Sequence, residues 1–214
     1  MKRLLIGIAG LVGLTISSCA ISILATALPK ELIQQTIACP TDGKAKIENF
    51  QVVSTHRWSQ GVVVLFSGLC PGEGKAAMKR IIGHKVIKRS GIHWQISSSD
   101  SYVLKNAPSK PEKLVNYRVN RSPNQNSDRY TVLYGQILKP KVATVEATFN
   151  NGQILRDHSS NSAFVLIATG ATGVCEVRIL GSDNQILRQE EPTISKRMAK
   201  DGNPQQCLPV SHQL

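Results

Sequence analysis

The chain has 214 residues, which is long enough for one large domain or two small ones. Hydrophobic residues make up 41% of it and aromatic residues 5%, and the hydrophobic content is that of an ordinary globular protein. Lysine and arginine (26) outnumber aspartate and glutamate (14), and the net charge of +12 favours anionic neighbours, such as membrane headgroups, wall polymers or nucleic acid, over cationic ones.

An uncharged segment follows the first three residues. It runs from Leu4 to Leu28, which is 25 residues, and about 20 apolar residues are enough to span a bilayer. Three interpretations stay open. The stretch "ISSCA" resembles a bacterial lipobox, in which Cys19 carries the lipid. Cleavage after Ala25-Thr26-Ala27 would fit a signal peptide, and retention would give a membrane anchor whose preceding basic residues stay inside.

All three interpretations export residues 30–214 to the periplasm or the cell exterior, where disulfides persist. The exported part contains four cysteines: Cys39, Cys70, Cys175 and Cys207. Three pairings are possible, and Cys39–Cys70 with Cys175–Cys207 is favoured because each pair lies within one of the two segments described below. No C-x2-C spacing is present, so a metal site is not expected.

A change of composition divides the exported part. Residues 105–129 are rich in Pro, Asn, Ser and charge, and they predict a linker with one apolar island at Leu114-Val115. The predicted organisation is a membrane anchor or signal segment over 1–28, a small α+β domain over 30–125, a β-sandwich over 126–190 and a polar tail over 191–214.

The α+β domain is expected to open with a short helix from Pro29 to Ala38 that leaves the membrane, with Pro29 in its first turn. "IENFQVVST" and "GVVVLFSG" predict strands, "KAAMKRIIG" a short helix, and "KVIKRSGIHWQIS" a hairpin that turns at Ser90-Gly91. Trp58 and Trp94 are the expected core anchors of this domain.

The second segment predicts an antiparallel sheet protein. Residues 130–137 form a β-branched and aromatic run, and "VATVEATF" alternates with a period of two, which predicts a strand buried on one face only. Asn150-Asn151-Gly152 supplies a hairpin turn. "AFVLIAT", "VCEVRIL" and "QILR" follow, separated by turns at 170–173 and 181–184, which is typical of a small antiparallel sandwich.

The motifs "YGQILKPKVATVEATFNNGQ", "AFVLIAT" and "VCEVRILGSDNQIL" together resemble a module of bacterial exported proteins over roughly residues 130–190. The resemblance implies an immunoglobulin-like extracellular β-sandwich without a known catalytic site. It supplies no functional residues to carry over.

Motifs for catalysis are incomplete. "SGLCPGEGKAAMKR" resembles a phosphate-binding loop, but Leu69 replaces the first glycine and Ala76 the Ser or Thr that binds magnesium. "DHSS" at 157–160 and Asp100 within "SSSDS" are expected in loops or turns. An exported hydrolase that uses His84, His93 or His158 with a nearby carboxylate is the alternative function, and close contact of these groups in a cleft would support it.

One basic stretch remains as a candidate binding surface. It contains six cations and no acid: Lys75, Lys79, Arg80, Lys85, Lys88 and Arg89. Such a stretch can be a solvated face or a contact surface for an anionic partner. Because aromatic residues do not alternate with these cations, nucleic acid ranks below lipid headgroups and cell-wall polymer. The sequence therefore predicts a non-catalytic, membrane-tethered, extracytoplasmic binding protein without a cofactor.

Overall fold

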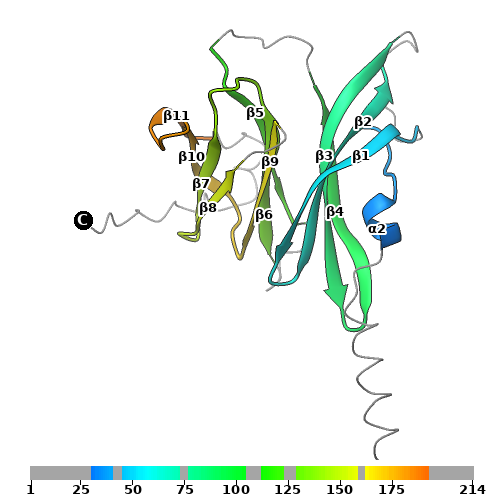
Figure 1. The fold of residues 1–214 in the computed structure, drawn as a ribbon. Coiled ribbons are helices and arrows are strands. Elements are labelled where there is room, and N and C mark those ends of the chain that lie inside the picture. Colours follow the sequence, from blue (N-terminus) through cyan, green and yellow to red (C-terminus); the bar gives the residue numbers. More distant parts are fainter. Residues whose placement is uncertain are drawn as a thin grey trace, which may run out of the picture.

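The computed structural model describes residues 30–40, 45–72, 77–104, 112–122, 129–158 and 162–192. These residues form three layers of antiparallel sheet that stack side by side, as the left-to-right order in Figure 1 shows. The predicted predominance of β structure is confirmed. The segment 1–28, Cys19, Cys207 and the tail from residue 193 lie outside the described residues. Within the described ranges, no helix has the length and apolar character needed to cross a membrane.

The first layer is a four-stranded meander in the order β1-β2-β3-β4, in which each strand pairs with the next along the chain. Its strands are β1 (Glu48–Trp58), β2 (Gly61–Pro71), β3 (Met78–Ser90) and β4 (His93–Val103). The continuous apolar run of β2 is explained by burial on both of its faces: Val63 and Leu65 face the sandwich, while Val64 and Phe66 face the opposite side.

Two predictions for this segment are wrong. The expected helix in "KAAMKRIIG" is the beginning of β3, because its paired isoleucines, Ile81 and Ile82, fill the cores on the two faces of the sheet. Asp100, expected in a turn, lies inside β4 opposite His84. The hairpin turn at Ser90-Gly91 is confirmed, and Gly91 has the positive φ of 60° that this turn requires.

The short helix predicted over Pro29–Ala38 is confirmed in part, as α2 (Lys30–Gln34), and residues 35–38 are not helical. Leu32 and Ile33 of α2 pack on a cluster that contains Val62 and Ile87 of the meander. Figure 1 shows α2 on the side of the meander away from the other two layers. The first segment as described is therefore a β meander with one peripheral helical turn, and the balanced α+β unit that was expected is corrected to this.

The other two layers are a three-stranded sheet, β5-β6-β9, and a four-stranded sheet, β11-β10-β7-β8. The bounds are β5 (Val115–Arg121), β6 (Tyr130–Ile137), β7 (Thr144–Phe149), β8 (Ile154–His158), β9 (Ala163–Thr169), β10 (Val174–Leu180) and β11 (Ile186–Glu190). Five of these strands were predicted. The other two were not: β5 lies in the expected linker, and β8 includes Asp157 and His158 of the expected loop "DHSS".

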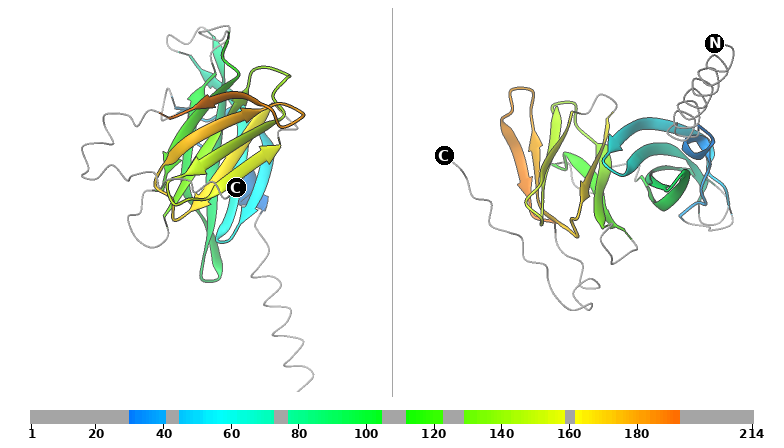
Figure 2. Two further views of the ribbon diagram at one scale, coloured as in Figure 1. Left: turned by 90° about the vertical axis from the view of Figure 1, so that its left-hand side faces the viewer. Right: turned by 90° about the horizontal axis from the view of Figure 1, so that it is seen from below.

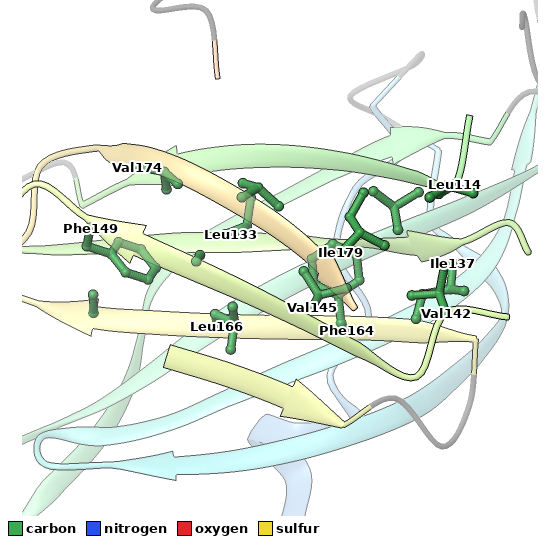
Figure 3. Packing of buried hydrophobic residues seen from close by; sticks show 14 of the residues in the cluster. Leu114, Leu133, Ile137, Val142, Val145, Phe149, Phe164, Leu166, Val174 and Ile179 are labelled. Atoms are coloured by element: carbon green, nitrogen blue, oxygen red, sulfur yellow. The ribbon is translucent and has the colours of Figure 1, made fainter. Parts of the chain in front are cut away.

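A hydrophobic core fills the space between these two sheets, which therefore form a sandwich (Figure 3). Val145, Phe149, Phe164 and Ile179 are among its members, and they come from both sheets. The other face of β7 was expected to be exposed. That prediction is wrong, because Glu146 on this face is only 3% exposed and forms ion pairs with arginines on both neighbouring strands.

The meander packs against the outer face of the three-stranded sheet. Val63, Leu65 and Val86 of the meander contact Tyr130 and Tyr134 of β6 in one buried cluster. The right-hand view of Figure 2 shows the resulting sequence of layers, with the three-stranded sheet in the middle. Tyr134, in the middle layer, is fully buried.

The expected disulfide Cys39–Cys70 is present, with a Cα–Cα distance of 5.8 Å. It joins the segment after α2 to β2. Cys175 is disulfide-bonded as well. Its expected partner, Cys207, lies outside the described residues, so the pairing Cys175–Cys207 stays a prediction.

Candidate anionic-ligand pocket at the hairpin end of the meander

The structure divides the predicted basic stretch into separate places. Lys75 lies outside the described residues. Lys79 and Arg80 are exposed near the beginning of β3, opposite Cys70 and Leu69. Lys88 and Arg89 lie at the other end of the strand, about 30 Å away at roughly 3.3 Å per residue. The five described cations of the stretch therefore do not form one continuous face.

Lys85 is fully buried in the middle of β3. Its ammonium donates a hydrogen bond to the backbone carbonyl of Gln35 at 2.7 Å and lies 4.9 Å from the centre of the Phe50 ring. Burial lowers the pKa of Lys85 to about 8. Because it is buried and bound to the carbonyl that directly follows α2, Lys85 has a structural position and does not belong to a solvated binding face.

A hollow of about 600 Å³ lies at the end of β3 that carries Lys88 and Arg89. Its lining includes three cations and three further polar or aromatic side chains: Arg57, Lys88, Arg89, Trp58, Gln60 and Trp94. No acidic residue is among the described residues that line it. Its volume is in the range of about 300–1,000 Å³ typical of small-molecule sites. We call this hollow the hairpin pocket.

Two turns of the meander meet to form the hairpin pocket, because alternate turns of a meander lie at the same end of the sheet. Figure 1 shows the β1–β2 and β3–β4 turns at the lower end of this layer. The Arg89 N–H donates to the Gln60 carbonyl oxygen at 3.3 Å and so connects the two turns. At Gly61 a Cβ atom would lie 2.0 Å from the Ile87 carbonyl oxygen, so only glycine permits this close approach.

Aromatic rings hold one of the cations in place. The Lys88 ammonium lies 5.6 Å from the centre of the Trp58 ring and 5.2 Å from that of Tyr130. Cation–π contacts at such distances are worth about 0.5–2 kcal/mol, more where water is excluded. Trp58 in turn packs edge-on against Tyr130 at 5.5 Å between ring centres. Lys88 is therefore positioned by the contact between the meander and the middle layer.

Three buried polar atoms near the hairpin pocket have no hydrogen-bond partner within the described part of the chain: the indole nitrogens of Trp58 and Trp94 and the amide oxygen of Gln60. Buried polar atoms are nearly always paired in folded proteins. An indole N–H can only donate, so it needs an acceptor such as an anionic oxygen. These three atoms are buried, the Gln60 oxygen is an acceptor and the two indoles lie on opposite faces of the meander. The suitability of the hollow for an anion therefore rests on its three cations and on the lack of an acid among its described lining residues.

The three histidines of the hydrolase alternative lie apart. His84 is fully buried and faces Tyr134, with ring centres 4.5 Å apart. His93 is exposed at the beginning of β4. His158, at the end of β8, lies 2.9 Å from the Thr144 hydroxyl through Nδ1. No two of them line one of the described pockets, and no cluster of three His, Cys, Asp or Glu side chains suited to a metal occurs among the residues described.

Sequence reasoning missed most of the hairpin pocket. Arg57 and Gln60 were not selected, and Trp58 and Trp94 were predicted only as core anchors, although both are half-buried at the edges of the core. The available signal was the repeated pairing of a cation and an aromatic residue beside a turn. Such pairs flank the first and the third turn of a meander, and these turns lie at the same end.

Comparison with family models, with curated proteins and with solved structures finds no match to this chain.

Proposed function

We propose that this chain is a non-catalytic, membrane-tethered, extracytoplasmic binding protein that holds an anionic group of its partner in the hairpin pocket. The observation that carries the proposal is that Arg57, Lys88 and Arg89 line one hollow that has no acidic side chain among its described lining residues. The partner class is an anionic lipid headgroup or an anionic wall polymer. Both present phosphate or carboxylate oxygens, which arginine and lysine bind well.

Placement outside the cytoplasm is part of this proposal and has two supports. The disulfide Cys39–Cys70 is typical of proteins in oxidising compartments. The uncharged run from Leu4 to Leu28 is long enough for an anchor. Cys19 within that run provides the alternative attachment, by lipidation.

We further propose that residues 115–190 act as an immunoglobulin-like scaffold for the meander. The arrangement of three strands against four is in keeping with such modules, which place their specificity outside the sandwich core. Because the middle layer contributes Tyr130 to the support of Lys88, the scaffold also contributes to the geometry of the hairpin pocket.

The chain contains two tryptophans, Trp58 and Trp94, and both line the hairpin pocket, so fluorescence excited selectively in tryptophan reports this end of the meander. The full chain in detergent is titrated with inorganic phosphate and with soluble poly(glycerol phosphate). We expect a saturable change of emission that weakens as salt rises. Arg57→Gln/Arg89→Gln should reduce the affinity roughly 30-fold, at about 1 kcal/mol for each cation.

Lys79→Gln/Arg80→Gln is the matched control, because it removes two exposed cations from the opposite end of the meander. This variant should bind like the parent. Equal losses in both variants would show a general charge effect, and no loss in the pocket variant would refute the proposed site. Melting curves of both variants check that the fold is intact.

A further inference from the structure

The β3–β4 hairpin ends in an exposed apolar residue. Ile92 is 67% exposed, more than any other large hydrophobic side chain of the described residues. It follows Gly91 at the tip, where Ser90 pairs with His93 and closes the hairpin. Since a Cβ atom at Gly91 would find no neighbour within 4 Å, the tip projects away from the remainder of the fold.

Cations and indole rings lie directly behind this tip. Arg89 and Trp94 face each other across the two strands, one pair further from the tip than Ser90 and His93. Arg89 and Trp94 also line the hairpin pocket, together with Arg57 and Lys88. An apolar residue at the tip, with tryptophan and basic residues together behind it, is typical of a segment that meets the boundary between the interior and the headgroups of a membrane.

The chain enters the fold beside the same end of the meander. Leu32 and Ile33 of α2 pack in the cluster that also contains Val62 and Trp94, and these last two residues line the hairpin pocket. The uncharged run ends in sequence at Leu28, two residues before α2 begins. A chain attached to a bilayer by that run therefore holds this end of the meander within a few residues of the surface.

We propose that the β3–β4 hairpin is a membrane-contacting loop, with Ile92 inserted at the headgroup boundary and the cations of the hairpin pocket on the phosphates of anionic lipids. This inference rests on the proposed function and selects its partner. A soluble wall polymer would use the cations equally well, but it offers no apolar phase for Ile92. An exposed isoleucine and a positive pocket together fit a lipid surface.

The experiment uses the full chain, transferred from detergent into vesicles whose lipids carry bromine on the upper part of the acyl chains. Bromine quenches tryptophan nearby, so Trp58 and Trp94 report the approach of the hairpin. We expect quenching in vesicles that contain phosphatidylglycerol and weaker quenching in pure phosphatidylcholine. The difference should diminish as salt rises, because headgroup attraction is screened.

Two pairs of variants separate insertion from simple proximity. Ile92→Ser should remove about half or more of the quenching, whereas Ile186→Ser, at a residue 56% exposed on β11 of the sandwich, should leave it unchanged. Arg57→Gln/Arg89→Gln should abolish the dependence on phosphatidylglycerol, and Lys79→Gln/Arg80→Gln should retain it. Undiminished quenching in Ile92→Ser would overturn the inference, because the attachment alone would then explain it.

The titration with soluble phosphate and polymer distinguishes failure of the membrane-contacting loop from failure of the proposed function. If Ile92→Ser and the parent are equally unquenched in vesicles but both bind poly(glycerol phosphate), the membrane-contacting loop is refuted and the proposed function stands with a polymer partner. If neither vesicles nor soluble anions respond to Arg57→Gln/Arg89→Gln, the proposed function fails together with the inference.

Discussion

His84 and Lys85 are neighbours on β3, and both are fully buried although both can carry charge. They face opposite sides of the meander, as successive residues of a strand must. Lys85 keeps its donor satisfied through the Gln35 carbonyl. Neither ring nitrogen of His84 has a hydrogen-bond partner in the described residues. Burial lowers the pKa of His84 to about 4, and the charge of Asp100 offsets only part of this effect.

This pKa predicts a dependence of stability on pH. In the unfolded chain a histidine binds its proton near pH 6.5, but folded His84 stays neutral down to about pH 4. The contribution of neutral His84 to the free energy of unfolding is therefore complete above pH 6.5. It is lost as the pH falls towards 4, by on the order of 2–3 kcal/mol. His84→Phe should remove this part of the decrease, measured by urea unfolding at pH 7.5 and 4.5.

His93→Phe is the control, because it removes an exposed histidine from the same sheet and leaves the buried His84 in place. If His84→Phe loses as much stability as the parent between the two pH values, His84 is not the group responsible.

At the scale of elements, β3 determines how the basic stretch can function. Its 13 residues make it the longest of the described strands, and it pairs with β2 and β4 along most of its length. Because side chains alternate between its faces, cations close in sequence are separated in space. Among the described residues, only at the end of β3 next to the turn do its cations line a hollow together with a cation of another strand, Arg57 on β1, although Lys88 and Arg89 as neighbours point to opposite faces.

The segment between α2 and β1 depends on the disulfide for its attachment. Cys39 is 3% and Cys70 0% exposed, and both belong to a small cluster with Ile47, Phe66 and Ile81. The bond spans a sequence separation of 31 residues. Closing a loop of that length restricts the unfolded chain by about 3–4 kcal/mol in the entropic model.

Cys39→Ala/Cys70→Ala should therefore lower the free energy of unfolding by about 2–4 kcal/mol, as measured in urea. Hydrogen exchange should increase first in residues 30–40, which the bond attaches to β2. This double variant leaves Cys175 intact, so the effect belongs to one bond. A loss below about 1 kcal/mol would show that packing alone holds the segment.

At the scale of the whole molecule, polar contacts as well as apolar packing join the meander to the sandwich. The Tyr134 hydroxyl donates to the Asp100 carboxylate at 2.7 Å, and Arg118 Nη1 lies 3.7 Å from the other carboxylate oxygen. The Tyr102 hydroxyl donates to the Asn116 carbonyl at 3.2 Å. Burial and the neighbouring Asp100 raise the pKa of Tyr134 far above its usual value, so it remains a donor.

We therefore expect the described layers to unfold in one cooperative transition. Asp100→Ala should cost about 1–3 kcal/mol, because it leaves the buried Tyr134 hydroxyl without its acceptor. In a double-mutant cycle with Tyr134→Phe the two losses should be less than additive, by about 1 kcal/mol or more. Calorimetry of the four proteins gives the result. Two separate transitions, with only one of them shifted, would refute the coupling.

The sequence by itself determined five of the seven strands of the sandwich, the hairpin turn at Ser90-Gly91 and the favoured bond between Cys39 and Cys70, but it missed β5 and β8. These features are local: β-branched runs, glycines where φ is positive, and cysteines within one segment. Periodicity also failed locally. It predicted a helix at the beginning of β3 and an exposed side chain for Glu146. Both predictions are wrong because periodicity does not show which layer covers the second face of a strand.

Only the tertiary structure decided where the cations lie. Residues 75–89 are a single basic stretch in sequence, but strand geometry divides them between two ends and two faces, and Lys85 is buried. The hairpin pocket is formed by two turns about 30 residues apart, which only the pairing of β2 with β3 brings together. Pairing in a sheet is a long-range contact that no short window of sequence contains, and for that physical reason Arg57 and Gln60 were missed.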